Sequence, residues 1–495
     1  MSILEDSNID FTKLFFPQSI GIIGASIDPA GGGFFYRAMK DKFRGSIYLF
    51  NPKLAGKKLF GKPVYASILD VSEPIDYVIL AVPARIVPQI LEEIGQQKIP
   101  FCTIFASGFR EVGNKDLEKK TLEIARKYKV RLIGPNCLGV YNPRGGLHFG
   151  FDQSRKAGNF GGIFQSGGIA QNISQLAVSY GLYASKFISV GNSLDLSPAD
   201  FLDYFIDDEH TKIIGLYIEN LRSIETGRKF MQMMKKSNLN RKPVILWRAG
   251  YGEATKKAIL SHTGGLAGNN QIWKAVGKQT GSCIVENSNE LAALASAFNL
   301  VSLPNSRDVG VIGIGGGSTI EAVDILEKYN LKIPTLSERT INKMKRFIPD
   351  VNTNLTNPID LGGMGIQPNI YYRTILALNR DPNISSIVFI KDPERFGGFA
   401  EILDELGYHG MDLNREFIRY IAKAKSVSTK PMYCVMLKIN EGFEEYKSRY
   451  KFKLKLLNRN VPVFESLELT GSILDKLNSY REFLQKHKKY PKKSN

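Results

Sequence analysis

The sequence predicts an α/β protein that consists of three successive units, each built on a parallel sheet. Short apolar runs alternate with stretches of helical length from residue 19 to residue 485. Strands that alternate with helices in this way form parallel sheets with right-handed crossovers. The length of 495 residues suits three domains of ~150 residues each, and the hydrophobic fraction of 43% suffices for their cores.

We expect the domain boundaries to follow changes in composition along the chain. The expected ranges are 1–145 for a Rossmann-like domain, 158–303 for a second α/β domain, 305–480 for a third and 481–495 for a basic tail. Residues 146–159 are rich in Gly, Pro and Arg, and they are expected to form a linker.

The composition indicates a cytoplasmic protein. No apolar run approaches the ~20 residues that span a bilayer. The first six residues lack the basic and apolar regions of a signal peptide, so we expect neither export nor a membrane partner. The cysteines are scattered, which predicts neither a disulfide framework nor a metal site; they are Cys102, Cys137, Cys283 and Cys434.

The formal net charge of +18 is compatible with nucleic acid, an acidic partner or polyanionic small molecules. Lysine and arginine are spread along the whole chain, with one dense run over residues 486–493. No zinc finger, RNA-recognition signature or basic-aromatic stripe occurs. We therefore expect no nucleic-acid partner.

In the first domain, apolar runs predict strands over residues 19–25, 47–50, 77–82, 101–105 and 131–133. Helices are expected between them, over residues 34–42, 86–96 and 115–128. Ligands of such sheets bind at the carboxyl ends of the strands. The candidate binding residues are therefore those around each strand end: Gly24, Ala25, Ser26, Asn51, Lys53, Val82, Pro83, Ser107, Gly108 and Asn136.

The residues after the second strand favour a nucleotide with a phosphorylated ribose. An NAD site usually carries Asp or Glu there for the ribose hydroxyls, whereas this chain has Asn51 and Lys53. A lysine suits the 3′-phosphate of coenzyme A, and it also suits NADP. The first turn lacks a clean G-x-G-x-x-G, which weakens the dinucleotide interpretation. A Rossmann-like domain without a nucleotide is the remaining alternative.

Residues 56–62 match the spacing of a P-loop, but the next residue is Pro63 rather than Ser or Thr. No hydroxyl is therefore offered to Mg²⁺, and no helix can run smoothly through a proline. We predict a basic hairpin at this place.

In the second domain, a strand over residues 162–164 runs into Gln165-Ser166-Gly167-Gly168, which opens a helix to residue 180. Free N–H groups and the positive dipole end favour an anion at this helix start. Ser166, Gly167 and Gly168 thus form a candidate phosphate site. Further strands are expected over residues 186–190, 212–218 and 243–247, and Glu219 directly follows the middle one.

The candidate nucleophile is His262, which lies in Ser261-His262-Thr263-Gly264-Gly265-Leu266-Ala267-Gly268. A neutral imidazole is a nucleophile near pH 7, and small neighbours such as Gly264 and Gly265 let ligands approach closely. The carboxylate of Glu219 could accept the His262 N–H and fix its tautomer. The alternatives are a glycine-rich turn with a solvated histidine, and a surface or capping role for Glu219.

In the third domain, strands are expected over residues 309–314, 387–390 and 432–436, with helices over residues 319–329 and 467–485. The Gly315-Gly316-Gly317 run at the end of the first strand favours packing of a helix or an interface over nucleotide binding.

Taken together, these stretches resemble the NDP-forming acyl-CoA synthetases, which include succinyl-CoA synthetase. The order and spacing are similar to the α subunit of the archaeal ADP-forming acetyl-CoA synthetases, strongly over residues 15–300 and more weakly to residue 475. The stretches that carry the resemblance are residues 21–26, 51–53, 81–84, 107–109, 134–139, 165–168, 191–192, 217–219 and 261–268.

The resemblance implies a CoA-binding domain, two flavodoxin-like domains and a reversible three-step relay. Acyl-CoA and phosphate give an acyl phosphate and CoA, His262 takes the phosphoryl group, and a nucleoside diphosphate receives it. Glu219 would stabilise His262, and the helix that opens at Gly167 and Gly168 would hold the phosphoryl group. CoA would contact Ala25, Ser26, Lys53, Val82, Ser107 and Asn136.

Nothing after residue 300 matches an ATP-grasp domain, so ADP or ATP with Mg²⁺ would bind to a β-type partner subunit. Two departures from the family pattern are Phe164, expected to reshape the phosphate or acyl pocket, and the Gly315–Gly317 run. A non-catalytic CoA-binding regulatory protein and an NADP-dependent oxidoreductase are the alternative functions.

Overall fold

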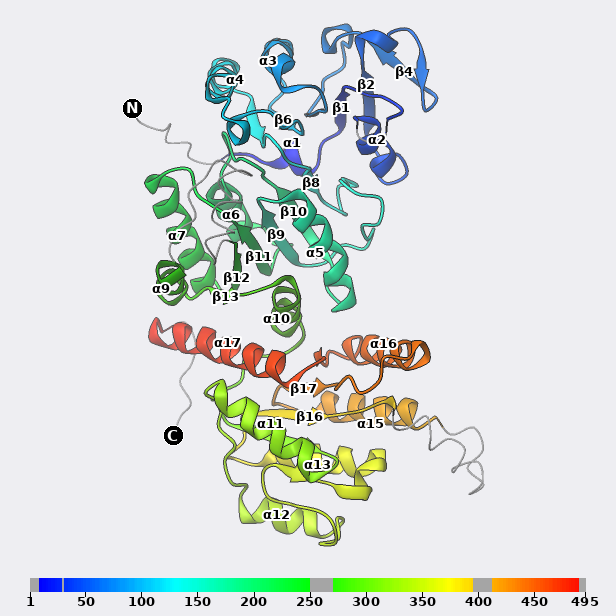
Figure 1. Ribbon diagram of the computed structural model, residues 1–495, viewed down its shortest axis with the longest axis vertical. Helices are drawn as coiled ribbons and strands as arrows, with labels where there is room; N and C mark the ends of the chain where they lie inside the picture. The colour runs from blue at the N-terminus through cyan, green and yellow to red at the C-terminus, as the bar shows by residue number, and fades with distance from the viewer. Residues whose placement is uncertain (1–8, 29–30, 250–269, 395–411, 489–495) are drawn as a thin grey trace. The chain divides into compact units, whose positions relative to one another are not determined.

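The computed structural model describes residues 9–28, 31–249, 270–394 and 412–488. These residues form three sheets, of seven, six and five strands, in two compact units (Figure 1). The first unit contains the first two sheets and covers residues 1–178 and 182–291. The second unit contains the third sheet and covers residues 179–181 and 292–495.

The first sheet confirms the predicted strands of the Rossmann-like domain. Its order is β3-β4-β2-β1-β5-β6-β7. The five strands from β2 to β7 in this order, which carry the candidate site, run parallel. They are β1 (Ser19–Ile23), β2 (Ser46–Phe50), β5 (Tyr77–Leu80), β6 (Phe101–Ile104) and β7 (Arg131–Ile133). Every residue of β1, β5 and β6 is buried, which explains why these strands are continuous apolar runs.

The helices of this sheet are α2 (Gly33–Met39), α3 (Val87–Gln96) and α4 (Lys115–Tyr128). The last two pack side by side (Figure 1). The predicted basic hairpin is also confirmed: β3 (Lys58–Leu59) pairs antiparallel with β4 (Lys62–Tyr65). Pro63 is tolerated because the pairing of β4 with β2 begins only at Val64.

The second sheet has the order β13-β12-β11-β9-β10-β8. Its parallel strands are β9 (Phe160–Phe164), β10 (Ala184–Ser189), β11 (Ile213–Ile218), β12 (Val244–Arg248) and β13 (Cys283–Val285). Its helices are α5 (Gly167–Ser179), α6 (Pro198–Asp207), α7 (Ile224–Leu239) and α9 (Asn270–Thr280), of which α6 and α7 pack together. The next helix, α10 (Ser288–Leu300), continues into the second unit.

One edge of this sheet differs from the prediction. The strand β8 (Gly139–Tyr141) pairs antiparallel with β10, so the sheet is mostly rather than wholly parallel and begins before residue 145. The expected linker is also partly a core segment, because His148 and Phe149 are only 2% and 0% exposed. Three residues are too few to show a strand period, and tertiary pairing alone reveals this edge strand.

The third sheet is parallel, with the order β15-β14-β16-β17-β18. Its strands are β14 (Val309–Gly313), β15 (Ile359–Asp360), β16 (Ser386–Ile390), β17 (Met432–Val435) and β18 (Val463–Phe464). Its helices are α11 (Gly316–Lys328), α12 (Glu338–Lys345), α13 (Pro368–Arg380), α15 (Leu413–Val427), α16 (Phe443–Leu457) and α17 (Leu467–Lys486).

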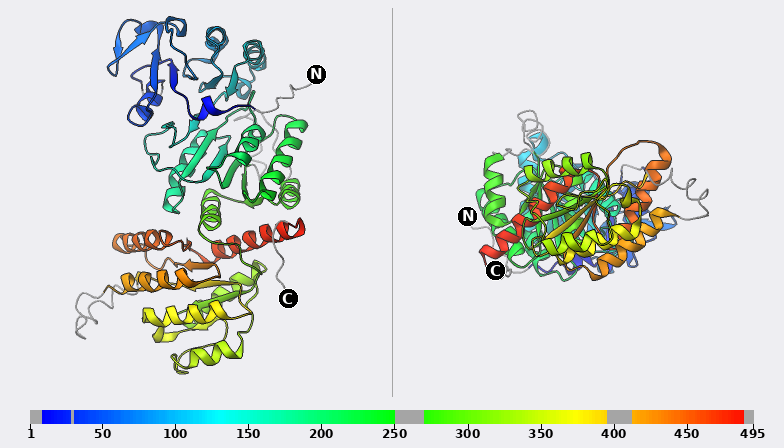
Figure 2. Two further views of the ribbon diagram at one scale, coloured as in Figure 1. Left: turned by 180° about the vertical axis from the view of Figure 1, so that it is seen from behind. Right: turned by 90° about the horizontal axis from the view of Figure 1, so that it is seen from below.

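In the second unit, α11 packs with α17, and α13 packs with α15 (Figure 2). The Gly315–Gly317 run forms the turn into α11, where Gly315 has a φ of +95° and its N–H donates to Asp360 Oδ1 at 2.7 Å. Across the described ranges, no helix has the length and apolar character needed to cross a membrane.

Candidate functional site

The ten candidate residues of the first domain lie at one edge of the first sheet. They follow the carboxyl ends of β2, β1, β5, β6 and β7, which are neighbours in this order. Gly24 has a φ of +88°, and a Cβ there would lie 2.1 Å from the Ala81 carbonyl oxygen. Only glycine therefore fits between β1 and β5 at this point.

Asn51 and Lys53 lie together but act differently. The Asn51 amide donates from Nδ2 to the Ala25 carbonyl at 2.8 Å, and its Oδ1 accepts the Lys53 N–H at 3.0 Å. Asn51 is thus occupied in tying β1 to β2. The Lys53 side chain is exposed and makes no ion pair among the described residues, so its charge is available to a ligand.

The remaining first-sheet residues form a partly open rim. Pro83 and Ser107 are exposed, and Val82, Gly108 and Asn136 are half-buried. Gly108 and Asn136 have φ values of +113° and +59°, which mark tight turns after β6 and β7. The structure therefore brings all ten residues to one edge of the sheet.

Glu111, which sequence reasoning missed, connects this rim to the second sheet. Its Oε1 accepts the N–H groups of Gly108 and Phe109 at 2.5 and 3.1 Å, and its Oε2 accepts from Asn192 Nδ2 at 2.5 Å. Burial alone would raise the pKa of Glu111, but these backbone and side-chain donors outweigh it and lower the pKa below its usual value. Glu111 is therefore charged at neutral pH and holds the turn after β6.

The predicted helix start lies at the carboxyl end of β9. The helix α5 begins at Gly167, and Ser166 Oγ accepts the Ile169 N–H at 3.4 Å as a cap. Gly168 is exposed, and a Cβ there would meet only Ser166 Oγ, at 4.0 Å. The space next to the Gly168 backbone is therefore open, as an anion site requires.

Glu219 lies at the carboxyl end of β11 and is only 5% exposed, which excludes the alternative of a surface charge. Gln165 Oε1 accepts the N–H groups of Glu219 and Asn220 at 2.5 and 3.0 Å. Burial, followed by the charge of Glu219 and a hydrogen bond to it, raises the pKa of the neighbouring Tyr217 hydroxyl. A buried carboxylate in this position interacts strongly with any nearby cation.

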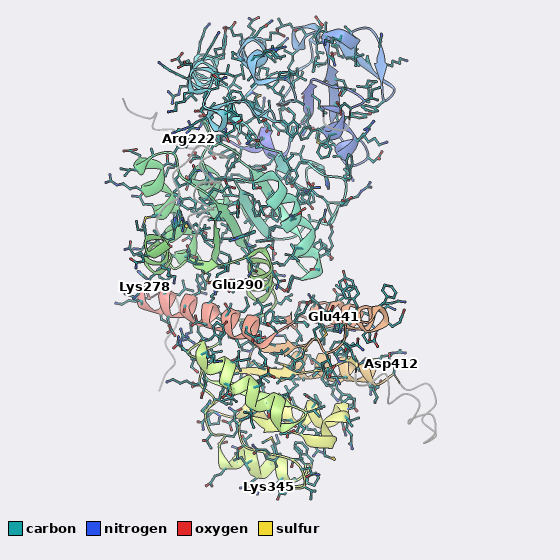
Figure 3. All side chains as sticks on the ribbon, in the orientation of Figure 1. Arg222, Lys278, Glu290, Lys345, Asp412 and Glu441 are labelled. Atoms are coloured by element: carbon teal, nitrogen blue, oxygen red, sulfur yellow. The ribbon has the colours of Figure 1, made fainter. Side chains whose placement is uncertain are left out.

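Three residues beyond Glu219, Arg222 forms a bidentate ion pair with Glu118 of α4. The two N–O distances are both 2.9 Å, and Arg222 Nη1 also donates to the Asn192 carbonyl at 3.1 Å. Figure 3 labels Arg222 within the first unit. The Glu118 side chain is 6% exposed. This pair, like Glu111 with Asn192, links the first sheet's helices to the loops of the second sheet.

A cavity of about 980 Å³ lies beside these groups. Its wall includes Gln165, directly after β9, and Asn220, two residues after β11. Arg110, after β6, and Arg222 also line it. The cavity therefore extends from the turn after the first-sheet rim to the strand ends near Glu219. Among the described residues, no group of three or more His, Cys, Asp or Glu side chains could hold a metal ion.

His262, Gly264 and Gly265 lie outside the described residues, so their geometry stays a prediction. The described chain stops after Ala249, whose N–H donates to the Ile218 carbonyl at 3.2 Å. Ile218 directly precedes Glu219, and the description resumes at α9. The described chain therefore ends beside Glu219.

Phe164 corrects one expectation. Its side chain is 0% exposed, its ring centroid lies 5.1 Å from that of Phe187, and its ring fills the space that the missing side chain of Gly162 leaves. Because Phe164 packs in the core of the second sheet, it does not shape a phosphate or acyl pocket. The strand alternation turns its side chain inward, whereas Gln165 follows toward the site.

Two family models match the first two sheets: a CoA binding domain over residues 18–143 and a succinyl-CoA ligase-like flavodoxin domain over residues 157–298. An ADP-forming acetate–CoA ligase of Methanocaldococcus jannaschii is 38% identical over 349 residues, which is 70% of this chain and 48% of that protein. The α subunit of an ADP-forming acetate–CoA ligase of Pyrococcus furiosus is 35% identical, over 78% of this chain and 83% of its own length.

Among solved structures, acetyl-coenzyme A synthetase 1 of Ca. Korarchaeum cryptofilum, in complex with phosphate and ADP, has a TM-score of 0.82 and 26% identity. The match covers 97% of this chain and 99% of that one. The chain nevertheless spans only about half the length of some curated relatives, 48% and 55% for the first and third matches.

Proposed function

We propose that this chain, which belongs to the family of the ADP-forming acetate–CoA ligases, is the α-type subunit of an acyl-CoA synthetase. It would interconvert acyl-CoA, phosphate and ADP with a carboxylic acid, CoA and ATP. The observation that carries the proposal is the buried Glu219, whose N–H donates to Gln165, two residues before the start of α5.

In the proposed relay, phosphate attacks the thioester carbonyl, and CoA leaves as an acyl phosphate forms. His262 then takes the phosphoryl group and releases the carboxylic acid. The N–H groups at Gly167 and Gly168 would hold the phosphoryl oxygens, while Glu219 would accept the other ring N–H of His262 and balance the imidazolium charge. Ser166, Gly264 and Gly265 would complete this phosphate site.

The first-sheet rim fits CoA as the thiol substrate. Gly24 and Gly108 bring backbone close to a ligand, and Lys53 offers an unpaired charge to the ribose 3′-phosphate. In this arrangement Asn51 supports the rim without contacting CoA through its amide. The cavity beside Arg110 and Gln165 would connect the thioester to the phosphoryl site.

The nucleotide half of the reaction would belong to a separate chain. Relatives in Pyrococcus furiosus are named as α subunits, and residues 309–464 of this chain are taken up by a five-stranded parallel sheet and its helices. We propose an ATP-grasp β-type partner that binds ADP or ATP with Mg²⁺.

The test is to incubate the purified chain with acetyl [³²P]phosphate. We expect acid-labile label on the wild-type chain, none on His262→Ala, and ATP from ADP and Mg²⁺ only after an ATP-grasp partner is added. Absence of label on the wild type would favour the regulatory alternative. Thermal stabilisation by NADP and not by CoA would instead favour an oxidoreductase.

A further inference from the structure

The side chain of Gln165 continues the hydrogen bonding between β9 and β11 beyond the last backbone bond of β9. The last backbone bond at this end of β9 joins the Gln165 N–H to the Tyr217 carbonyl at 3.0 Å. Two residues later, the chain turns into α5 at Gly167. Beyond this point, Gln165 Oε1 accepts from the Glu219 and Asn220 N–H groups, and its Nε2 donates to the Asn220 carbonyl at 2.8 Å.

These three bonds fix the backbone of Glu219 relative to the start of α5. The backbone of β9 turns into α5 after Gln165, so the Gln165 side chain takes over its pairing with β11 at residues 219–220. Gln165 is 4% exposed, so water does not substitute for these bonds, and a lost partner leaves buried backbone groups unsatisfied.

We infer that Gln165 is the positioning residue that sets the Glu219 carboxylate against the helix start that binds the phosphoryl group. The inference rests on the proposed function. It adds a residue with no role in binding CoA and none in the chemistry of His262. Gln165 acts through Glu219: it keeps the carboxylate and the α5 N–H groups in one fixed geometry while the phosphoryl group moves.

The first measurement is site-resolved amide exchange, which does not depend on activity. In Gln165→Ala, the Glu219 and Asn220 amides should exchange faster by about tenfold, because one hydrogen bond is worth about that factor. The control is Gln175→Ala, at an exposed glutamine within the adjoining helix α5, which should leave both amides unchanged. Unchanged exchange in Gln165→Ala overturns the inference.

The second measurement is the lifetime of the phosphoenzyme formed from acetyl [³²P]phosphate, relative to wild type at each pH. Gln165→Ala should shorten the lifetime at every pH while CoA affinity stays the same. Gln165→Glu matches the amide in size, and when protonated it can both accept and donate. Its lifetime should approach wild type below about pH 5 and shorten above about pH 8, where the carboxylate is charged.

If residue 165 only fills space, the phosphoenzyme lifetime of Gln165→Glu should not return toward the wild-type value at low pH. A lifetime that does not change with pH relative to wild type would therefore overturn the inference. If Gln165→Ala does not fold, the pH profile and amide exchange of Gln165→Glu decide the question alone. A wild type that takes no label means that the proposed function has failed, while the exchange experiment still tests the contact between Gln165 and Glu219.

Discussion

The carboxyl-terminal edges of the first and second sheets share a parallel design, but they use polar groups in opposite ways. On the first edge, Lys53 and Ser107 are exposed, and the Lys53 charge has no partner among the described residues. On the second edge, Glu219 and Gln165 are 5% and 4% exposed, and Gln165 is fully engaged with the strand beside it. The two edges therefore suit different tasks.

An exposed cation in water gives modest, screened affinity, which suits a polyanionic ligand that must bind and leave. A buried carboxylate acts in a low effective dielectric, where its charge strongly stabilises a cation that develops during a reaction. Under the proposed function, the first edge would bind the ligand and the second would perform the chemistry. Four predictions follow this division, in order of expected effect.

The largest effect should come from neutralising the buried carboxylate. Glu219→Gln keeps the shape but cannot balance a charged imidazolium, so phosphoryl transfer to and from His262 should slow by on the order of 10²–10⁴. Rapid-quench labelling with acetyl [³²P]phosphate measures this rate. Glu209→Gln, at an 84% exposed carboxylate, is the control and should leave the rate unchanged. Equal rates in both variants would remove the chemical role from the second edge.

The next effect concerns the ion pair that joins the two sheets. Arg222→Ala leaves the Glu118 carboxylate buried without its cation, and the free energy of unfolding of the first unit should fall by about 3 kcal/mol. Urea denaturation measures it. The matched pair Lys236–Asp203 is about half exposed, at 48% and 45%, so Lys236→Ala should cost less than about 1 kcal/mol. A similar loss in both variants would mean that burial does not distinguish these pairs.

On the binding edge, Lys53 should provide selectivity for the ribose phosphate. One charge-assisted contact is worth roughly 1.5–3 kcal/mol, so wild type should prefer CoA over dephospho-CoA by on the order of ten- to a hundredfold. Lys53→Ala should lose most of this preference in calorimetric titrations, whereas Lys57→Ala, an exposed lysine nearby, should retain it. If wild type binds both ligands equally, Lys53 does not contact the phosphate.

The smallest effect near neutral pH is a pH dependence on the buried side. Burial, followed by the charges of Lys42 and Arg155, lowers the pKa of His148 to about 3 from an ordinary 6.5. Below pH 6.5 the unfolded chain binds a proton at His148 that the native chain does not bind. The free energy of unfolding therefore decreases as the pH is lowered, by up to about 1.4 kcal/mol per pH unit, until about pH 3. His148→Gln should flatten this part of the urea-denaturation profile. An unchanged slope in His148→Gln would assign the loss to other groups.

Much of the local structure could be predicted because it depends on short stretches of sequence. The alternation of apolar runs and helical stretches predicted the strands of the first two sheets that carry candidate residues, and Pro63 predicted the hairpin in place of a P-loop. The turn at Gly24 and the helix start at Gly167 follow from residues adjacent in the chain, since conformational freedom and free N–H groups are local properties.

The contacts that make the site specific depend on tertiary structure alone. Gln165 meets Glu219 across 54 residues, Glu111 meets Asn192 across 81, and Arg222 meets Glu118 across 104. Periodicity shows that a strand exists, but not which strand lies next to it or which side chain bridges the gap. The same limit hid β8 and placed Phe164 in a pocket instead of the core. The sequence determined the secondary-structure elements and the types of reactive residue. Tertiary contacts between residues far apart in the chain decided which of these residues are buried, which are charged and which are held by hydrogen bonds.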